Sequence, residues 1–185
     1  MICGNGSKIN EKEYNSMYDK EMQITKNFKL KEFTNSETAK KLGIDNHAQL
    51  TQKEFVNITG IAENILQPIR DTMHIPIYIS SGFRCPQLNR AVHGAAKSQH
   101  CKGEAVDIYI KPTIKSNLLA TLAGVRATLW DVFSFIYTLC DFDQLIWETR
   151  PNGSKWIHVS YVTYRKNRKM VLQCKDGKSY QSLSL

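Results

Sequence analysis

The chain has 185 residues, 42% of them hydrophobic and 23% charged, which suits one globular domain with a sizeable core. No window approaches the roughly 20 apolar residues of a membrane span, which argues against stable membrane insertion, and five cysteines without a CxxC pair argue against a disulfide framework or a cysteine-type zinc site. The formal net charge of +8 favours a polyanionic partner, but without an RNP, helix-turn-helix or zinc-finger signature we expect no specific nucleic-acid partner.

The N-terminal part of the chain divides into a polar segment and the start of a domain. Residues 1–27 show no sustained hydrophobic period, and we interpret them as a flexible or loosely packed extension before one domain at residues 28–185. The extension lacks the apolar core of a signal peptide, so we expect the protein to be made in a cytoplasm. A short alternating run at 28–33 then precedes a helix predicted over 37–42, which Gly43 ends.

The clearest helix of the chain follows this region. Thr51 and Glu54 have the spacing of a capping box, and apolar residues recur from there to Ile69 at three- and four-residue steps. Pro68 either kinks this helix near its end or begins a new turn. A β-branched strand is predicted next, over 75–80.

Candidate site residues begin directly after this strand. Arg84 has a planar guanidinium that suits a substrate carboxylate or carbonyl oxygen in a cleft; the alternative is an exposed surface arginine. A short helix over 86–92 and a loop over 93–98 lead to a strand predicted over 105–110. Alternation in this strand puts Asp107 on the polar face, and its apolar neighbours face the core: Val106, Ile108 and Ile110.

Helical and then extended patterns fill the remainder of the chain. Residues 117–140 are apolar enough for one or two helices, broken near Gly124 or Asp131. The last residues, 170–183, are predicted to form a hairpin. The basic run at 164–169 before it is interpreted as a solvated turn.

Another hairpin carries most of the remaining site candidates. Residues 142–148 and 155–161 form its predicted arms around an Asn-Gly turn. If Glu148 pairs with Trp156, the apolar residues of both arms share one face, whereas a slip of one residue mixes both faces. Glu148 then lies near His158, either as a candidate general base for a metal-bound water or as a surface carboxylate at a strand end. The same polar face carries Gln144, Ile146, Glu148, Trp156, His158 and Ser160.

Helices early and in the middle of the chain, with strands gathered late, predict an α+β fold. We expect a single domain in which the helices pack on a small, mostly antiparallel sheet.

Two histidines and one carboxylate are the candidate ligands of a metal ion. His100 precedes Asp107 by seven residues, and His158 lies on the polar face of the hairpin. Two imidazoles and one carboxylate are the ligand set of an open catalytic zinc site, which leaves a fourth position for water. Cys101 is interpreted as a small apolar filler, because neighbouring side chains of an extended segment point to opposite sides. We therefore expect these three residues to hold one Zn²⁺.

The combined pattern resembles a known family of peptidoglycan peptidases. Ser98-x-His100-x-x-Gly103-x-Ala105-x-Asp107, followed by Trp156-x-His158-x-Ser160, is similar to the zinc D-alanyl-D-alanine carboxypeptidases and the L-alanyl-D-glutamate endolysins. These LAS-type enzymes share a fold with the Hedgehog signalling domain, and the resemblance is closest to their phage and prophage branch. It covers nearly everything from about residue 28 onward, including 33–43, 77–84, 88–92, 142–146 and 167–168.

The resemblance implies a role for each matching residue. Arg84 and Ser98 would contact the substrate or the tetrahedral oxyanion, and Gln144 is a further candidate substrate contact on the hairpin face. Many members carry the catalytic Asp or Glu three residues before the last histidine, where this chain has Lys155. Either Glu148 takes that role across the hairpin or the protein is catalytically impaired.

Three functions follow as hypotheses. The leading one is a zinc peptidase that cleaves peptidoglycan stem peptides. It would be encoded by the host or by a phage, made in a bacterial cytoplasm, and would act on the cell wall or in the periplasm. An endolysin of this kind would need a holin to reach the wall. The alternative is a non-enzymatic wall-binding or virion structural module that keeps the fold and the zinc site. A basic nucleic-acid-binding domain rests on charge alone.

Overall fold

The computed structural model describes residues 18–111, 127–177 and 179–183. The elements before the first candidate ligand are β1 (Gln23–Thr25), β2 (Phe28–Lys29), α2 (Leu30–Thr34), α3 (Glu37–Leu42), η1 (His47–Gln49), α4 (Gln52–Ile61), η2 (Ala62–Leu66), α5 (Gln67–Met73), β3 (Tyr78–Ser81) and α6 (Pro86–Ala91). The remaining elements are η3 (Gln99–Lys102), β4 (Ala105–Tyr109), α8 (Leu129–Leu139), β5 (Gln144–Thr149), β6 (Lys155–Ser160), β7 (Met170–Cys174) and β8 (Tyr180–Ser182).

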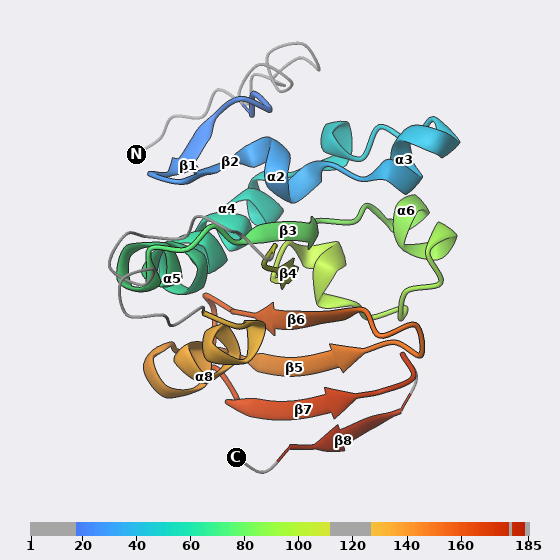
Figure 1. The fold of residues 1–185 in the computed structure, drawn as a ribbon. Helices are drawn as coiled ribbons and strands as arrows, with labels where there is room; N and C mark the ends of the chain where they lie inside the picture. Colours follow the sequence, from blue (N-terminus) through green and yellow to red (C-terminus); the bar gives the residue numbers. More distant parts are fainter. Residues whose placement is uncertain (1–17, 112–126, 178, 184–185) are drawn as a thin grey trace.

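A six-stranded sheet in the order β3-β4-β6-β5-β7-β8 organises the fold (Figure 1). Its neighbouring strands are antiparallel except β5 and β7, which run parallel. The parallel pair arises because residues 161–169 return the chain to the edge at which β5 begins, where Gln144 is paired with both Ser160 and Met170. The predicted α+β domain, with helices on a mostly antiparallel sheet, is confirmed.

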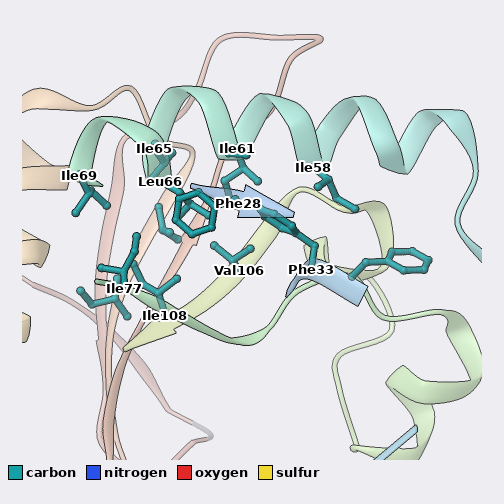
Figure 2. Close-up of a cluster of buried hydrophobic side chains, with 14 of the residues drawn as sticks. Phe28, Phe33, Ile58, Ile61, Ile65, Leu66, Ile69, Ile77, Val106 and Ile108 are labelled. Atoms are coloured by element: carbon teal, nitrogen blue, oxygen red, sulfur yellow. The ribbon is translucent and has the colours of Figure 1, made fainter. Parts of the chain in front are cut away.

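The apolar face of the sheet is covered by the long helical run α4-η2-α5 and by α8. Figure 2 shows Ile58, Ile61, Ile65 and Ile69 of this run facing the buried Val106 of β4 and its neighbours. Burying one such side chain contributes about 1.5–3 kcal/mol. On α8, Phe133 and Trp130 pack against Trp147 of β5, with ring centroids 5.7 and 5.0 Å away. The helices therefore leave the opposite, polar face of the sheet for the site.

The long helix begins as predicted but changes its winding before Pro68. Thr51 and Glu54 form the expected capping box at its start. The segment Ala62–Leu66 is a π-helix, and Pro68 stands in the first turn of α5. Proline has no N–H, and its ring clashes with the carbonyl four residues earlier, so one wider turn accommodates it without ending the helix. Of the described residues, no helix is long and apolar enough to cross a bilayer.

Two predicted boundaries shift for identifiable reasons. The strand predicted over 75–80 pairs only from Tyr78, because Pro76 before it has no N–H to donate to a ladder. Asp131 does not break a helix: it closes a capping box with Thr128 at the start of α8. The predicted residues 117–126, with Gly124, lie outside the described residues.

The described end of the predicted N-terminal extension is folded. Residues 23–25 form β1 and pair with β2. Tyr18 is only 8% exposed, and its ring lies 4.7 Å from that of Phe55 on α4. The packed chain therefore begins at least as early as Tyr18, before the boundary predicted at residue 27; residues 1–17 lie outside the described part.

The basic run at residues 164–169, before β7, makes ion pairs with a buried carboxylate and is not only a solvated turn. Arg165 and Arg168 both donate to the carboxylate of Asp143, with shortest distances of 2.6 Å each. The Asp143 side chain has no exposed surface, and it also accepts from the amide of Gln99 at 3.1 Å. This cluster fastens the crossover from β6 to β7 onto the start of β5 and onto the first residue of η3.

Candidate active site

Three candidate metal ligands from three separate elements meet on the polar face of the sheet. His100 lies on η3, Asp107 on β4 and His158 on β6, and their ligand atoms all lie within 4.8 Å of one another. Asp107 and His158 are direct cross-strand partners, with Nδ1 of His158 2.9 Å from Oδ1 of Asp107. The structure therefore brings together the three residues that the sequence singled out.

The imidazole of His100 is oriented by a backbone carbonyl. Its Nδ1 lies 2.8 Å from the carbonyl oxygen of Gly82, and its Nε2 lies 3.3 Å from Oδ1 of Asp107. Because the carbonyl can only accept, Nδ1 carries the proton and Nε2 keeps its lone pair for a metal. A side chain at Gly82 would put a Cβ 2.3 Å from the carbonyl oxygen of Phe33, so only glycine allows this approach.

The turn that carries His100 explains the glycine of the sequence motif. Gly103 ends η3 with φ of 68°, in the left-handed region that favours glycine. A Cβ at Gly103 would also lie 2.6 Å from the carbonyl oxygen of Glu54 on α4. Asn57 of α4 holds the same turn by donating to the carbonyl of Lys102 at 2.8 Å. The turn is helical and not extended as predicted for Cys101, which is half-buried and is not part of the ligand cluster found among the described residues.

The pKa shifts of Asp107 and His100 favour the protonation states that a metal requires. Burial would by itself raise the pKa of Asp107, but His100 and His158 outweigh it and hold that pKa well below its usual range. Burial lowers the pKa of His100, which favours the neutral imidazole. Metals bind ionised carboxylates and neutral imidazoles. Two imidazole nitrogens and one carboxylate oxygen within this radius therefore fit a divalent ion of zinc type.

Arg84 lies inside the site and not on the open surface. Its Nη2 donates to Oδ2 of Asp107 at 3.0 Å, and its Nε donates to Oγ of Ser81 at 2.8 Å. The side chain is 17% exposed, which rules out the alternative of an exposed surface arginine. Arg84 thus orients the second oxygen of the ligand carboxylate and faces the cavity described below.

Glu148 adjoins the ligands at the predicted register. It is paired with Trp156, and Ile146 is paired with His158, as the alternation of the two arms predicts. Glu148 is only 9% exposed, so it is not a surface carboxylate at a strand end. Burial, and next the charge of Asp107, raise the pKa of Glu148. A carboxyl group with a raised pKa beside a metal site has the property of a general base and acid.

A cavity of about 760 Å³ opens in front of these residues. Arg84, Ser98 and Glu148 line it together with the three candidate ligands. The hydroxyl of Ser98 accepts from the backbone N–H of His100 at 3.3 Å. Gln144 is not among the lining residues: its amide donates to the sulfur of Met170 at 3.4 Å. The structure therefore places the predicted residues in one cavity, with the exception of Gln144.

Some lining residues carry no signal in the sequence. Tyr180 reaches the cavity from β8, in the cross-strand row that joins Glu148 to Cys174 and Cys174 to Tyr180. Burial, and next the charge of Glu148, raise the pKa of Tyr180 to about 12, so its hydroxyl stays protonated. Identifying this row from sequence requires the parallel pairing of β5 with β7, which no local pattern indicates.

A comparison with protein families agrees with the site. The sequence profile of the family described as Peptidase M15 matches residues 26–132, more than half of the 185 residues. The matched stretch contains His100 and Asp107, whereas Glu148 and His158 lie beyond it and are brought to the site by the hairpin. No curated protein matches the chain. On its sequence, and with the candidate ligands assembled, the chain belongs to the peptidase M15 family.

Proposed function

We propose that this protein is a zinc-dependent peptidase that cleaves a peptide bond in bacterial peptidoglycan stem peptides, of the phage endolysin or cell-wall carboxypeptidase type. The observation that carries the proposal is the convergence of His100, Asp107 and His158 beside a buried Glu148 in one cavity. The family of the chain and the resemblance of its motifs to LAS-type enzymes support the substrate class.

The residues of the site divide the chemistry between them. His100, Asp107 and His158 would hold the zinc ion, which supplies Lewis acidity toward the scissile carbonyl and lowers the pKa of water. Glu148 takes a proton from the attacking water and returns it to the leaving amine. The raised pKa of Glu148 lies closer to neutral pH than the pKa of an ordinary glutamate, which suits a group that both accepts and returns a proton.

The negative charge that develops on the carbonyl oxygen needs donors in the same cavity. Arg84 keeps guanidinium hydrogens beyond the two directed at Asp107 and Ser81, and we assign it to that oxygen. Ser98 lines the neighbouring wall and contacts the substrate. Action on the wall from inside the bacterial cell requires passage across the membrane, so a holin is the partner we propose for an endolysin role.

The test is digestion of purified peptidoglycan followed by mass spectrometry of the released muropeptides, which reports activity and cleaved bond together. We expect turnover with zinc, loss of turnover with excess chelator, and recovery when zinc is restored. His158→Ala, which removes one ligand, serves as the inactive control. Undiminished turnover in chelator, or in His158→Ala, contradicts the proposal.

A second candidate function is a wall-binding or virion structural module that keeps the metal and lacks turnover. Lys155 favours it, because many LAS-type enzymes have a carboxylate at this position. Stoichiometric zinc together with binding to intact peptidoglycan, and no released muropeptide at any pH, would support this function over the peptidase.

A further inference from the structure

The hairpin of β5 and β6 extends the polar face beyond the metal ligands and Glu148. Moving along the hairpin toward its turn, the paired row of Glu148 and Trp156 is followed by Arg150 and Ser154. Arg150 donates its backbone N–H to the carbonyl of Ser154 at 2.9 Å, which fixes this row. All four residues line the cavity, so its wall continues from the chemistry to the hairpin turn.

The guanidinium of Arg150 lies over an aromatic ring, and among the described residues none accepts a hydrogen bond from it. Its central carbon lies 5.1 Å from the centroid of the Trp156 ring. A guanidinium over an aromatic face is attracted by the ring, while its N–H groups remain free in its own plane. Among the described residues no carboxylate lies within ion-pairing distance of Arg150, in contrast to Arg84, which is paired with Asp107.

An exposed guanidinium that lies over a ring, with its planar donors available, matches one chemical group above others. Carboxylates accept two parallel hydrogen bonds from a guanidinium. Arg150 follows the last residue of β5 and lines the same cavity as Glu148, two residues and therefore about 7 Å farther along the chain. An extended peptide covers that distance in about two residues, so a substrate carboxylate at Arg150 lies close to the bond that is attacked by the water Glu148 activates.

We propose that Arg150, held over Trp156 at the edge of the cavity, binds a free carboxylate of the substrate peptide one or two residues from the scissile bond. The inference rests on the proposed peptidase function and adds to it a requirement for an acidic substrate. Arg150 is then a specificity-determining residue, and a peptide with a carboxamide at that position is a poorer substrate.

The test uses the zinc-loaded full chain and three synthetic peptides. The first is the stem pentapeptide L-Ala-γ-D-Glu-L-Lys-D-Ala-D-Ala. The others have a carboxamide in place of either the free D-Glu carboxylate or the C-terminal carboxylate, which distinguishes the two sources of the recognised group. Binding is measured by calorimetry in a Glu148→Gln background, and kcat/KM is measured with native Glu148.

We expect one of the two amidations to weaken binding and kcat/KM by about tenfold, the range of a charge-assisted hydrogen bond at a partly exposed site. Arg150→Gln should lose the same factor on the acidic peptide and no longer distinguish it from that amide. Lys155→Gln is the matched control, because it removes one positive charge from the same hairpin at an exposed position outside the cavity. It should keep the preference.

Several outcomes overturn the proposal. One is that the protein with Arg150 binds and cleaves all three peptides equally well. Another is that the preference for the acidic peptide persists in Arg150→Gln. A third is an Arg150→Gln variant that shifts only the acidic limb of the pH profile, since Arg150 then acts through Glu148 alone. Preferential binding without cleavage of any peptide contradicts the peptidase function and leaves the Arg150 site standing, whereas absence of binding to all three contradicts both.

Discussion

Two buried aspartates, Asp107 on β4 and Asp143 directly before β5, have similar electrostatics and different surroundings. Asp143 is enclosed by two guanidinium groups and an amide, from Arg165, Arg168 and Gln99, and its side chain has no exposed surface. Asp107 is contacted by two imidazoles and one guanidinium, and it lines an open cavity. Both carboxyl groups have a pKa held well below the usual range.

The two clusters differ in whether the side chains around the aspartate can lose a proton. Arginine stays protonated at any working pH and cannot bind a metal, so the cluster around Asp143 is a closed structural clamp. Imidazole becomes neutral at moderate pH and then offers a lone pair, so the cluster around Asp107 exchanges protons for a metal ion. A lowered pKa therefore marks both sites, and the identity of the partners distinguishes the chemical site from the structural one.

The largest expected effect comes from Glu148→Gln, which tests the chemical side of this comparison. Removing a general base that acts in the transition state lowers kcat by about 10²–10⁴-fold. The three candidate ligands are untouched, so bound zinc, measured by elemental analysis, should remain stoichiometric. Full activity in this variant contradicts the assignment of Glu148, and loss of zinc together with activity would mean that Glu148 acts on the metal site itself.

Asp143→Asn tests the structural side. The variant keeps the shape of the side chain and removes the charge that Arg165 and Arg168 address, which we expect to lower the free energy of unfolding by about 2 kcal/mol. The folded protein should retain its kcat, because Asp143 lies outside the cavity. The measurement is urea denaturation next to steady-state turnover. Unchanged stability with impaired turnover would reverse the roles given to the two aspartates.

The pH dependence of stability follows from the lowered pKa of Asp143. An unfolded aspartate titrates near pH 4, and the folded pKa lies below that value. The stabilisation is therefore fully present above about pH 4 and is lost as pH falls below it toward the folded pKa. The difference in urea midpoint between the native chain and Asp143→Asn should be constant from pH 7 to 5 and shrink under more acidic conditions. A difference that grows on acidification contradicts the clamp.

Sequence patterns predicted the chemical site more completely than the clamp. Alternation in β4 and in both arms of the hairpin predicted that Asp107, Glu148 and His158 share a face, because a strand repeats every two residues. The Arg165–Asp143 contact joins a crossover to a residue that comes before β5, and no period links them. Tyr180 reaches the cavity only through the parallel β5–β7 pairing. Contacts set by tertiary topology, and not by local period, were therefore missed.

Lys155→Glu has the smallest expected effect. It introduces the negative charge that many LAS-type enzymes have at this position. In this chain Lys155 is paired with Thr149, one row from Glu148 and on the opposite face of the hairpin, and it is exposed outside the cavity. A carboxylate there points away from the zinc ligands. We therefore expect kcat to change by less than about threefold, the size of a surface charge effect, and no rescue when Lys155→Glu is combined with Glu148→Gln. Recovery of turnover in the double variant would mean that the hairpin can change its register, since only a slip of one residue brings position 155 to the site face.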